Sequence, residues 1–190
     1  YLLSGNLSAI ITVVYASIFA LPVPFKAVQL LFINLVTDSL PALAIGMEPG
    51  AKDILDRKPR DPKAGFMDQP FIQKFSLQGA LIAIGVIFAY QMGLQTNPNV
   101  ACTMAFSTLT LARLFHGFNC RNEHSIFRLG FKRNWYSLYA FLLGVCFLSL
   151  ILFVPSLHNL FSVTPLTMQQ IVSIGGLAIL PTIIIQLGKI

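Results

Sequence analysis

The sequence predicts an all-α fold, a polytopic bundle of six transmembrane helices. Of its 190 residues, 55% are hydrophobic and only 11% are charged, and the mean hydropathy is positive. Six apolar runs are each long enough to cross a bilayer as a helix, which takes about 20 residues. They are residues 1–21, 28–46, 75–94, 100–118, 135–154 and 168–187. This composition excludes an ordinary soluble domain and makes the lipid bilayer the first partner that we expect.

Most charged residues lie in two segments between apolar runs, 47–74 and 119–134. Nearly all the basic residues fall in these segments or at the C-terminal end, whereas the loops on the other side hold only Lys26. Because cytoplasmic loops carry an excess of Lys and Arg, we predict a multi-pass cell-membrane protein with both segments and both chain ends in the cytoplasm. This asymmetry accounts for the net charge of +6, so nucleic acid is not an expected partner.

The first two runs are joined by a very short turn. The run 1–21 carries Asn6 near its start and is stopped by the turn that begins at Pro22. The second run, 28–46, must therefore return antiparallel beside the first. The charged segment after it contains four prolines, which favour a shaped loop over a helix. The third run, 75–94, follows that loop.

The fourth run begins at good start signals, with Asn97 as N-cap and Pro98 as the first helical residue. It contains Arg113, the only Lys or Arg inside any apolar run. Two interpretations of Arg113 stay open. Either its side chain snorkels to the nearby cytoplasmic headgroups, or it faces inward as an internal positive charge. The fifth and sixth runs are joined by a segment without Lys or Arg, as expected of an outside loop.

A single carboxylate, Asp38, lies in the middle of the second run. A carboxylate near the bilayer centre costs about 2.5 to 3.5 kcal/mol on insertion scales, so it indicates a functional site by default. On an α-helix, Asn34 and Thr37 lie on the same face as Asp38. Three oxygen-bearing side chains suit a hard cation such as calcium better than a soft metal. The alternative is a structural bundle in which Asn and Thr are interhelical hydrogen-bond partners.

Pro41 follows this cluster within one turn. It lacks an N–H and clashes with the carbonyl four residues earlier, so we predict a helix break that frees backbone oxygens near Asp38. Broken helices at membrane depth occur where they line a cavity or a site. The sequence therefore predicts a cation site on an interrupted helix.

The second run also supports a family resemblance. The string Asn34-Leu-Val-Thr-Asp38-Ser-Leu-Pro41 and the charged segment after it resemble the sixth helix and following loop of P-type calcium-transporting ATPases. Tyr1-Leu-Leu-Ser-Gly-Asn6 is similar to the fifth helix of that family. The resemblance is close through about residue 63 and weaker beyond. It implies that residues 1–190 are the carboxy-terminal cation-ATPase transmembrane domain, family spans five to ten, of the bacterial single-calcium-site type.

The resemblance implies roles for particular residues. Asn34 and Asp38 become cation ligands, and Thr37 and Asn6 become candidate ligands. Two positions depart from family members that carry two calcium ions: Ala9 and Arg113 stand where those members have glutamates. The resemblance thus implies a pump for one ion, with Arg113 compensating charge at the vacated second site.

The activity that the resemblance implies is ATP-driven export of Ca²⁺, one ion per cycle, in exchange for protons. The family's D-K-T-G phosphorylation motif does not occur in the sequence, so we assign no catalytic residue. We expect a piece of a longer chain that cannot hydrolyse ATP alone. It would meet ATP and Mg²⁺ only through partner regions, the first four spans and the cytoplasmic domains. A P-type pump for Mn²⁺, Na⁺ or H⁺ and a secondary cation exchanger stay as alternatives.

Overall fold

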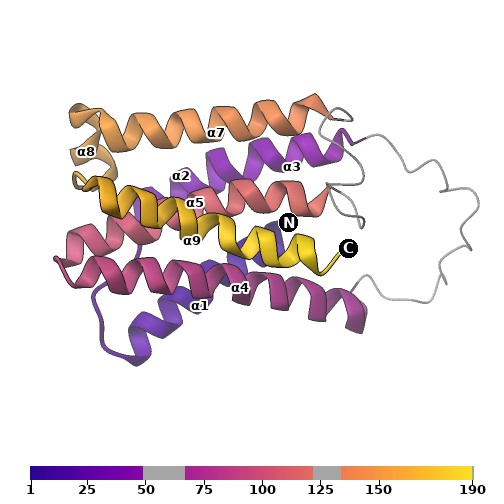
Figure 1. Ribbon diagram of the computed structural model, residues 1–190, viewed down its shortest axis with the longest axis horizontal. Coiled ribbons are helices and arrows are strands. Elements are labelled where there is room, and N and C mark those ends of the chain that lie inside the picture. Colours follow the sequence, from indigo (N-terminus) through magenta and orange to yellow (C-terminus); the bar gives the residue numbers. More distant parts are fainter. Residues whose placement is uncertain (49–66, 122–133, 190) are drawn as a thin grey trace, which may run out of the picture.

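A computed structural model describes residues 1–48, 67–121 and 134–189. Every regular element in these ranges is helical, which confirms the all-α fold (Figure 1). The elements are α1 (Leu2–Ile18), α2 (Ala27–Phe32), the π-helical turn η1 (Ile33–Asp38), α3 (Ser39–Gly46), α4 (Gln69–Leu94), α5 (Pro98–Cys120), α7 (Trp135–Phe153), α8 (Pro155–Phe161) and α9 (Met168–Leu187). Helices α2, η1 and α3 follow one another without a gap, so they form one continuous rod.

Four helical stretches of the described chain are long and apolar enough to cross a membrane. They are Ala27–Gly46, Gln69–Leu94, Trp135–Phe153 and Met168–Leu187. Helix α1 is apolar but has only 17 residues. Helix α5 has 23 residues, yet it carries many polar side chains and most of its residues are buried inside the bundle. The predicted count of six spans is therefore not confirmed, and the spanning role of α1 and α5 stays a prediction.

Helix α4 is longer than the predicted span 75–94. It begins at Gln69, inside the segment that we expected to be a loop. The Asp68 carboxylate accepts a hydrogen bond from the Phe71 N–H at 3.1 Å, and Pro70 lies in the first turn, where its missing N–H costs nothing. Pro70 thus starts a helix instead of shaping a loop. Most of the predicted loops 47–74 and 119–134 lies outside the described residues.

Helix α5 lies at the centre of the bundle. It packs against α4, α9, α7 and α3, and its Phe106 and Leu109 are fully buried. Figure 1 shows that α3, α5 and α9 end, and α4 and α7 begin, at the same end of the bundle. This alternation agrees with the predicted loops, although the side of the membrane that this end faces stays a prediction.

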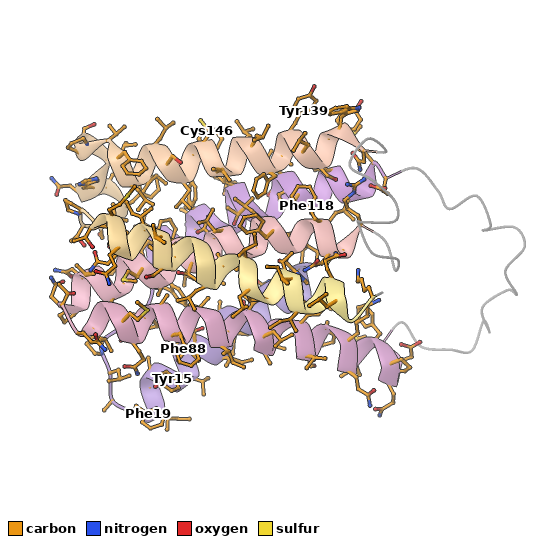
Figure 2. All side chains as sticks on the ribbon, in the orientation of Figure 1. Tyr15, Phe19, Phe88, Phe118, Tyr139 and Cys146 are labelled. Atoms are coloured by element: carbon orange, nitrogen blue, oxygen red, sulfur yellow. The ribbon has the colours of Figure 1, made fainter. Side chains whose placement is uncertain are left out.

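The outer surface of the bundle is largely apolar. Figure 2 shows Tyr139 on α7 projecting away from the bundle, and Tyr139 is 62% exposed. Phe88 on α4 is 60% exposed. Large apolar side chains are similarly exposed on every long helix except the central α5. Such a surface would be a liability in water, whereas lipid solvates it well.

Candidate functional site

The helix that carries the predicted site changes its winding at η1. A π-helical turn holds more residues than an α-helical turn and is frequent at functional sites. Just beyond it, Pro41 has no N–H to donate to the Thr37 carbonyl. The Tyr1 hydroxyl donates to that carbonyl instead, at 2.6 Å. The chain stays helical through Pro41 to Gly46, so the perturbation is a widened turn before the proline rather than the break that we predicted at Pro41.

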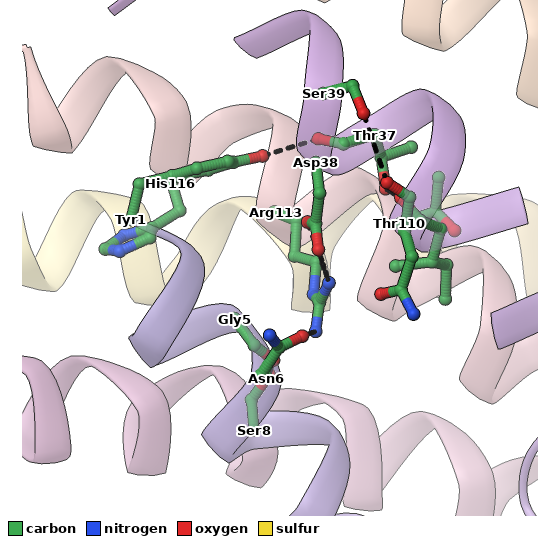
Figure 3. A network of polar contacts seen from close by, with 12 residues as sticks. Tyr1, Gly5, Asn6, Ser8, Thr37, Asp38, Ser39, Thr110, Arg113 and His116 are labelled. Carbon is green, nitrogen blue, oxygen red and sulfur yellow. Dashed lines mark hydrogen bonds and ion pairs between the residues drawn. The ribbon is translucent and has the colours of Figure 1, made fainter. Parts of the chain in front are cut away.

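Asp38 and Arg113 form a buried ion pair. The Nη1 atom of Arg113 donates to both carboxylate oxygens of Asp38, each at 2.8 Å (Figure 3). Arg113 is 1% exposed and Asp38 is 7% exposed. Of the two interpretations left open for Arg113, this conformation matches the internal positive charge and not a side chain that reaches the headgroups.

The same guanidinium also contacts α1. Its Nη2 atom donates to the side-chain oxygen of Asn6 at 3.0 Å. Arg113 therefore joins three helices, because α5 carries it, η1 supplies Asp38 and α1 supplies Asn6. Its third nitrogen, Nε, is buried and has no hydrogen-bond partner among the residues that the structure describes.

A cleft of about 960 Å³ opens beside the ion pair. Three of the four predicted ligands, Asn6, Asn34 and Asp38, line it. The rest of its wall comes from α1 and from α3 with the residue that follows it: Leu2, Ser39, Ala42, Leu43, Gly46 and Met47. The cleft thus offers amide and carboxylate oxygens within a mostly apolar wall, which is an environment in which a hard cation can bind.

Thr37 does not line this cleft. It is fully buried, and its hydroxyl donates to the Ile33 carbonyl oxygen at 2.7 Å. The π-helical turn explains the difference from the predicted face. Because the turn is wider, Thr37, three residues after Asn34, is rotated further from Asn34 than in an α-helix, whereas Asp38, four residues after Asn34, stays on nearly the same side. The expected convergence of three oxygen-bearing side chains is therefore reduced to Asn34 and Asp38 on this helix.

Sequence reasoning missed a polar cluster beside the site. The Ser4 hydroxyl lies 2.8 Å from Nε2 of His116, and the rings of Tyr1 and His116 are stacked with centroids 6.1 Å apart. His116 is fully buried, although as an isolated histidine it gave no ligand spacing in the sequence. Pro41 did signal a carbonyl in need of a donor, but nothing in the sequence identified Tyr1 as that donor. Within the described ranges, no group of three or more His, Cys, Asp or Glu side chains is placed to hold a metal ion.

Together these features define a class of protein. An apolar helical bundle holds a buried acid at an irregular turn, paired with a buried base and next to a cleft. Ionisable groups in such positions mark the ion and substrate paths of membrane transporters.

Comparison with known proteins gives the family. Residues 22–190 match the family described as "Cation transporting ATPase, C-terminus", and the chain belongs to this family. It is 35% identical over 188 residues to a calcium-transporting ATPase of Bacillus subtilis (strain 168), covering 97% of this chain and 21% of that protein. It is 38% identical over 191 residues to calcium-transporting ATPase 1 of Lactococcus lactis, covering 100% and 22%. It is also 38% identical over 193 residues to a calcium-transporting ATPase of Listeria monocytogenes, covering 100% and 22%.

These matches confirm the resemblance to the carboxy-terminal region of P-type calcium-transporting ATPases. The chain spans about a fifth of the length of the relatives that it matches.

Proposed function

We propose that this chain is the transmembrane part of an ATP-driven P-type pump that exports Ca²⁺ across the cell membrane. The observation that carries the proposal is Asp38, a carboxylate buried at a π-helical turn on the edge of a cleft that Asn6 and Asn34 also line. Relatives named calcium-transporting ATPases support calcium as the cation. Both ends of the chain face the cytoplasm in this proposal, and ATP and Mg²⁺ act through cytoplasmic domains of the longer pump.

The proposed ligand set starts from Asp38 and Asn34. Asn6 joins it when the Arg113 guanidinium moves off the Asn6 side-chain oxygen. Thr37 joins it only if the turn rearranges, because Thr37 is fully buried and does not line the cleft. Since Ca²⁺ takes six to eight oxygen ligands, the remaining ligands, including a second carboxylate, come from the fourth span of the longer pump.

Arg113 limits the proposed site to one ion. A guanidinium in the place of a second carboxylate repels a further cation, and at about 4 Å and an effective dielectric of about 20 each pair of unit charges is worth about 4 kcal/mol. After the ion is released outside, Arg113 and incoming protons offset the charge of Asp38. The ion pair seen here matches such an ion-free state.

Equilibrium binding of radioactive calcium to the full-length pump tests the proposal. We expect one bound ion per pump, and none in Asp38→Asn. Glu48→Gln is the matched control, because it neutralises a carboxylate just beyond the end of α3, outside the cleft. Two bound ions in the wild type would rule out the single-ion site. Retained binding of Mn²⁺ or Na⁺ without calcium binding would overturn the assignment of the cation.

A further inference from the structure

Gly5 lies where the Arg113 side chain passes α1 (Figure 3). A Cβ atom added at Gly5 would lie 3.0 Å from Nε and 3.1 Å from Cζ of Arg113. Non-bonded heavy atoms have their best contact at about 3.5 to 4.0 Å, so even a methyl group would press on the guanidinium. We propose that Gly5 is a positioning residue for Arg113, whose missing side chain makes the space in which the guanidinium reaches Asp38 and Asn6 at once.

The contact at Gly5 differs from those of the other glycines. A Cβ atom at Gly79 would meet the Ser4 carbonyl oxygen at 2.9 Å, and one at Gly85 would meet the Leu177 carbonyl oxygen at 2.8 Å. Those glycines allow two backbones to approach each other. Among the described glycines, only Gly5 faces a charged group. Its small size therefore serves the ion pair rather than the packing of two helices.

The guanidinium cannot avoid a side chain at position 5 by bending. It is a planar fork that moves as one body. Nη1 is fixed to Asp38 at 2.8 Å and Nη2 to Asn6 at 3.0 Å, while the unpartnered Nε is the nitrogen closest to Gly5. Any shift away from α1 must therefore lengthen at least one of these hydrogen bonds. Alanine is also the better helix former, so local helix propensity does not account for a glycine at this position.

This inference rests on the proposed function for its effect on transport. Calcium and Arg113 compete for Asp38 in the proposed cycle. A stronger ion pair therefore lowers the apparent affinity of the pump for calcium. A side chain at position 5 that loosens the ion pair then raises that affinity. Gly5 thus acts through Arg113 and sets the calcium concentration at which the pump works.

The test uses the full-length pump with Gly5→Ala, alone and combined with Arg113→Ala. We expect Gly5→Ala to lower the calcium concentration for half-maximal ATPase activity by about threefold to tenfold, equivalent to part of a charge-assisted hydrogen bond. In the Arg113→Ala background the same substitution should cause no shift. Gly176→Ala in α9 is the control, since a Cβ atom there meets nothing within 4 Å. No shift in the wild-type background, a rise, or an equal shift in both backgrounds would overturn the proposal.

Thermal unfolding without added ions separates this inference from the proposed function. Gly5→Ala should lower the unfolding midpoint of the detergent-purified pump, and it should not do so in the Arg113→Ala background. This readout holds even if the pump does not respond to calcium, which would refute the proposed function alone. If Gly5→Ala fails to fold, recovery of folding on adding Arg113→Ala supports the positioning role, and failure in both backgrounds refutes it.

Discussion

Two ion pairs connect the continuous rod of α2, η1 and α3 to α5, and they differ in what surrounds them. The inner pair is Asp38, the last residue of η1, with Arg113 of α5. The outer pair is Glu48, two residues beyond α3, with Arg121, the residue after α5. The shortest N–O distances are 2.8 and 2.9 Å, and the side chains are 1% and 9% exposed in the inner pair and 6% and 12% in the outer pair. The distances are therefore alike, and the outer pair is slightly more exposed than the inner pair.

The outer pair is supported by a third helix. Asn134, the N-cap of α7, donates from its side-chain nitrogen to Glu48 at 2.7 Å and to the Ala44 carbonyl oxygen at 2.8 Å. Its side-chain oxygen accepts from the Ser137 N–H at 3.2 Å. The Glu48 carboxylate is thus bound by donors from two directions, which suits a structural connection between helix ends.

The inner pair has an open side. Within the described residues, the Asp38 carboxylate accepts side-chain hydrogen bonds from Nη1 of Arg113 alone, and it faces the cleft. A cation that enters the cleft can therefore compete for Asp38, whereas Glu48 is already held by protein groups. In the proposed pump, the surroundings of the two ion pairs, more than their own geometry, separate the ion site from the structural contact.

The largest expected effect comes from neutralising the two carboxylates in turn. Asp38→Asn should abolish calcium uptake into vesicles that contain the full-length pump, because Asp38 is the only carboxylate among the described residues that line the cleft, and the substitution removes its charge. Glu48→Gln should leave the calcium dependence unchanged and lower only the unfolding temperature. Normal uptake by Asp38→Asn, or loss of uptake in both variants, would remove the distinction between the two pairs.

A smaller effect is expected from the two bases. Arg121→Met should lower the free energy of unfolding by about 1 to 3 kcal/mol, because it takes two hydrogen bonds from the partly buried Glu48 carboxylate, and should leave the calcium affinity unchanged. Arg113→Met is the matched comparison and should raise the calcium affinity, because Arg113 competes with calcium for Asp38 in the proposed cycle. Thermal unfolding and calcium titration of the purified pump measure both quantities. A change of calcium affinity in Arg121→Met would show that the outer pair belongs to the ion site.

The smallest effect is expected at Thr37, which lies next to Asp38 in the chain and whose hydroxyl donates a hydrogen bond to the Ile33 carbonyl oxygen of its own helix. Thr37→Ala should weaken calcium binding without abolishing transport, since a neutral hydrogen bond contributes about 0.5 to 1.5 kcal/mol. Thr12→Ala in α1 is the control, because the Thr12 hydroxyl is also buried and donates to its own helix, at 2.9 Å from the Ser8 carbonyl oxygen. If Thr37→Ala stopped transport as completely as Asp38→Asn, Thr37 would be a direct ligand.

Local signals in the sequence predicted much of the fold. Asn97 caps α5 as expected, through a hydrogen bond from the Val100 N–H at 2.9 Å, and α9 occupies the predicted range 168–187. The start of α4 was missed because Asp68 and Pro70 fit both a loop and a helix start. Short α8 was missed because its seven residues lie in a segment taken as an outside loop.

The site was less predictable, because its geometry depends on distant parts of the chain. The solitary acid at Asp38 was visible in the sequence, and so was the unusual position of Arg113. The π-helical turn that moves Thr37 away has no local sequence signal. The outer ion pair joins residues 73 positions apart, and the space beside Gly5 exists only once α1 and α5 are packed.

The placing of the two ion pairs limits how the bundle can flex. Glu48 follows Asp38 by ten residues, which corresponds to about 15 Å along a helix. Figure 1 shows α3 and α5 running in the same direction, so the outer pair anchors their neighbouring ends while the inner contact opens. Release of Arg113 from Asp38 would leave the ends of the two helices joined through Glu48 and Arg121.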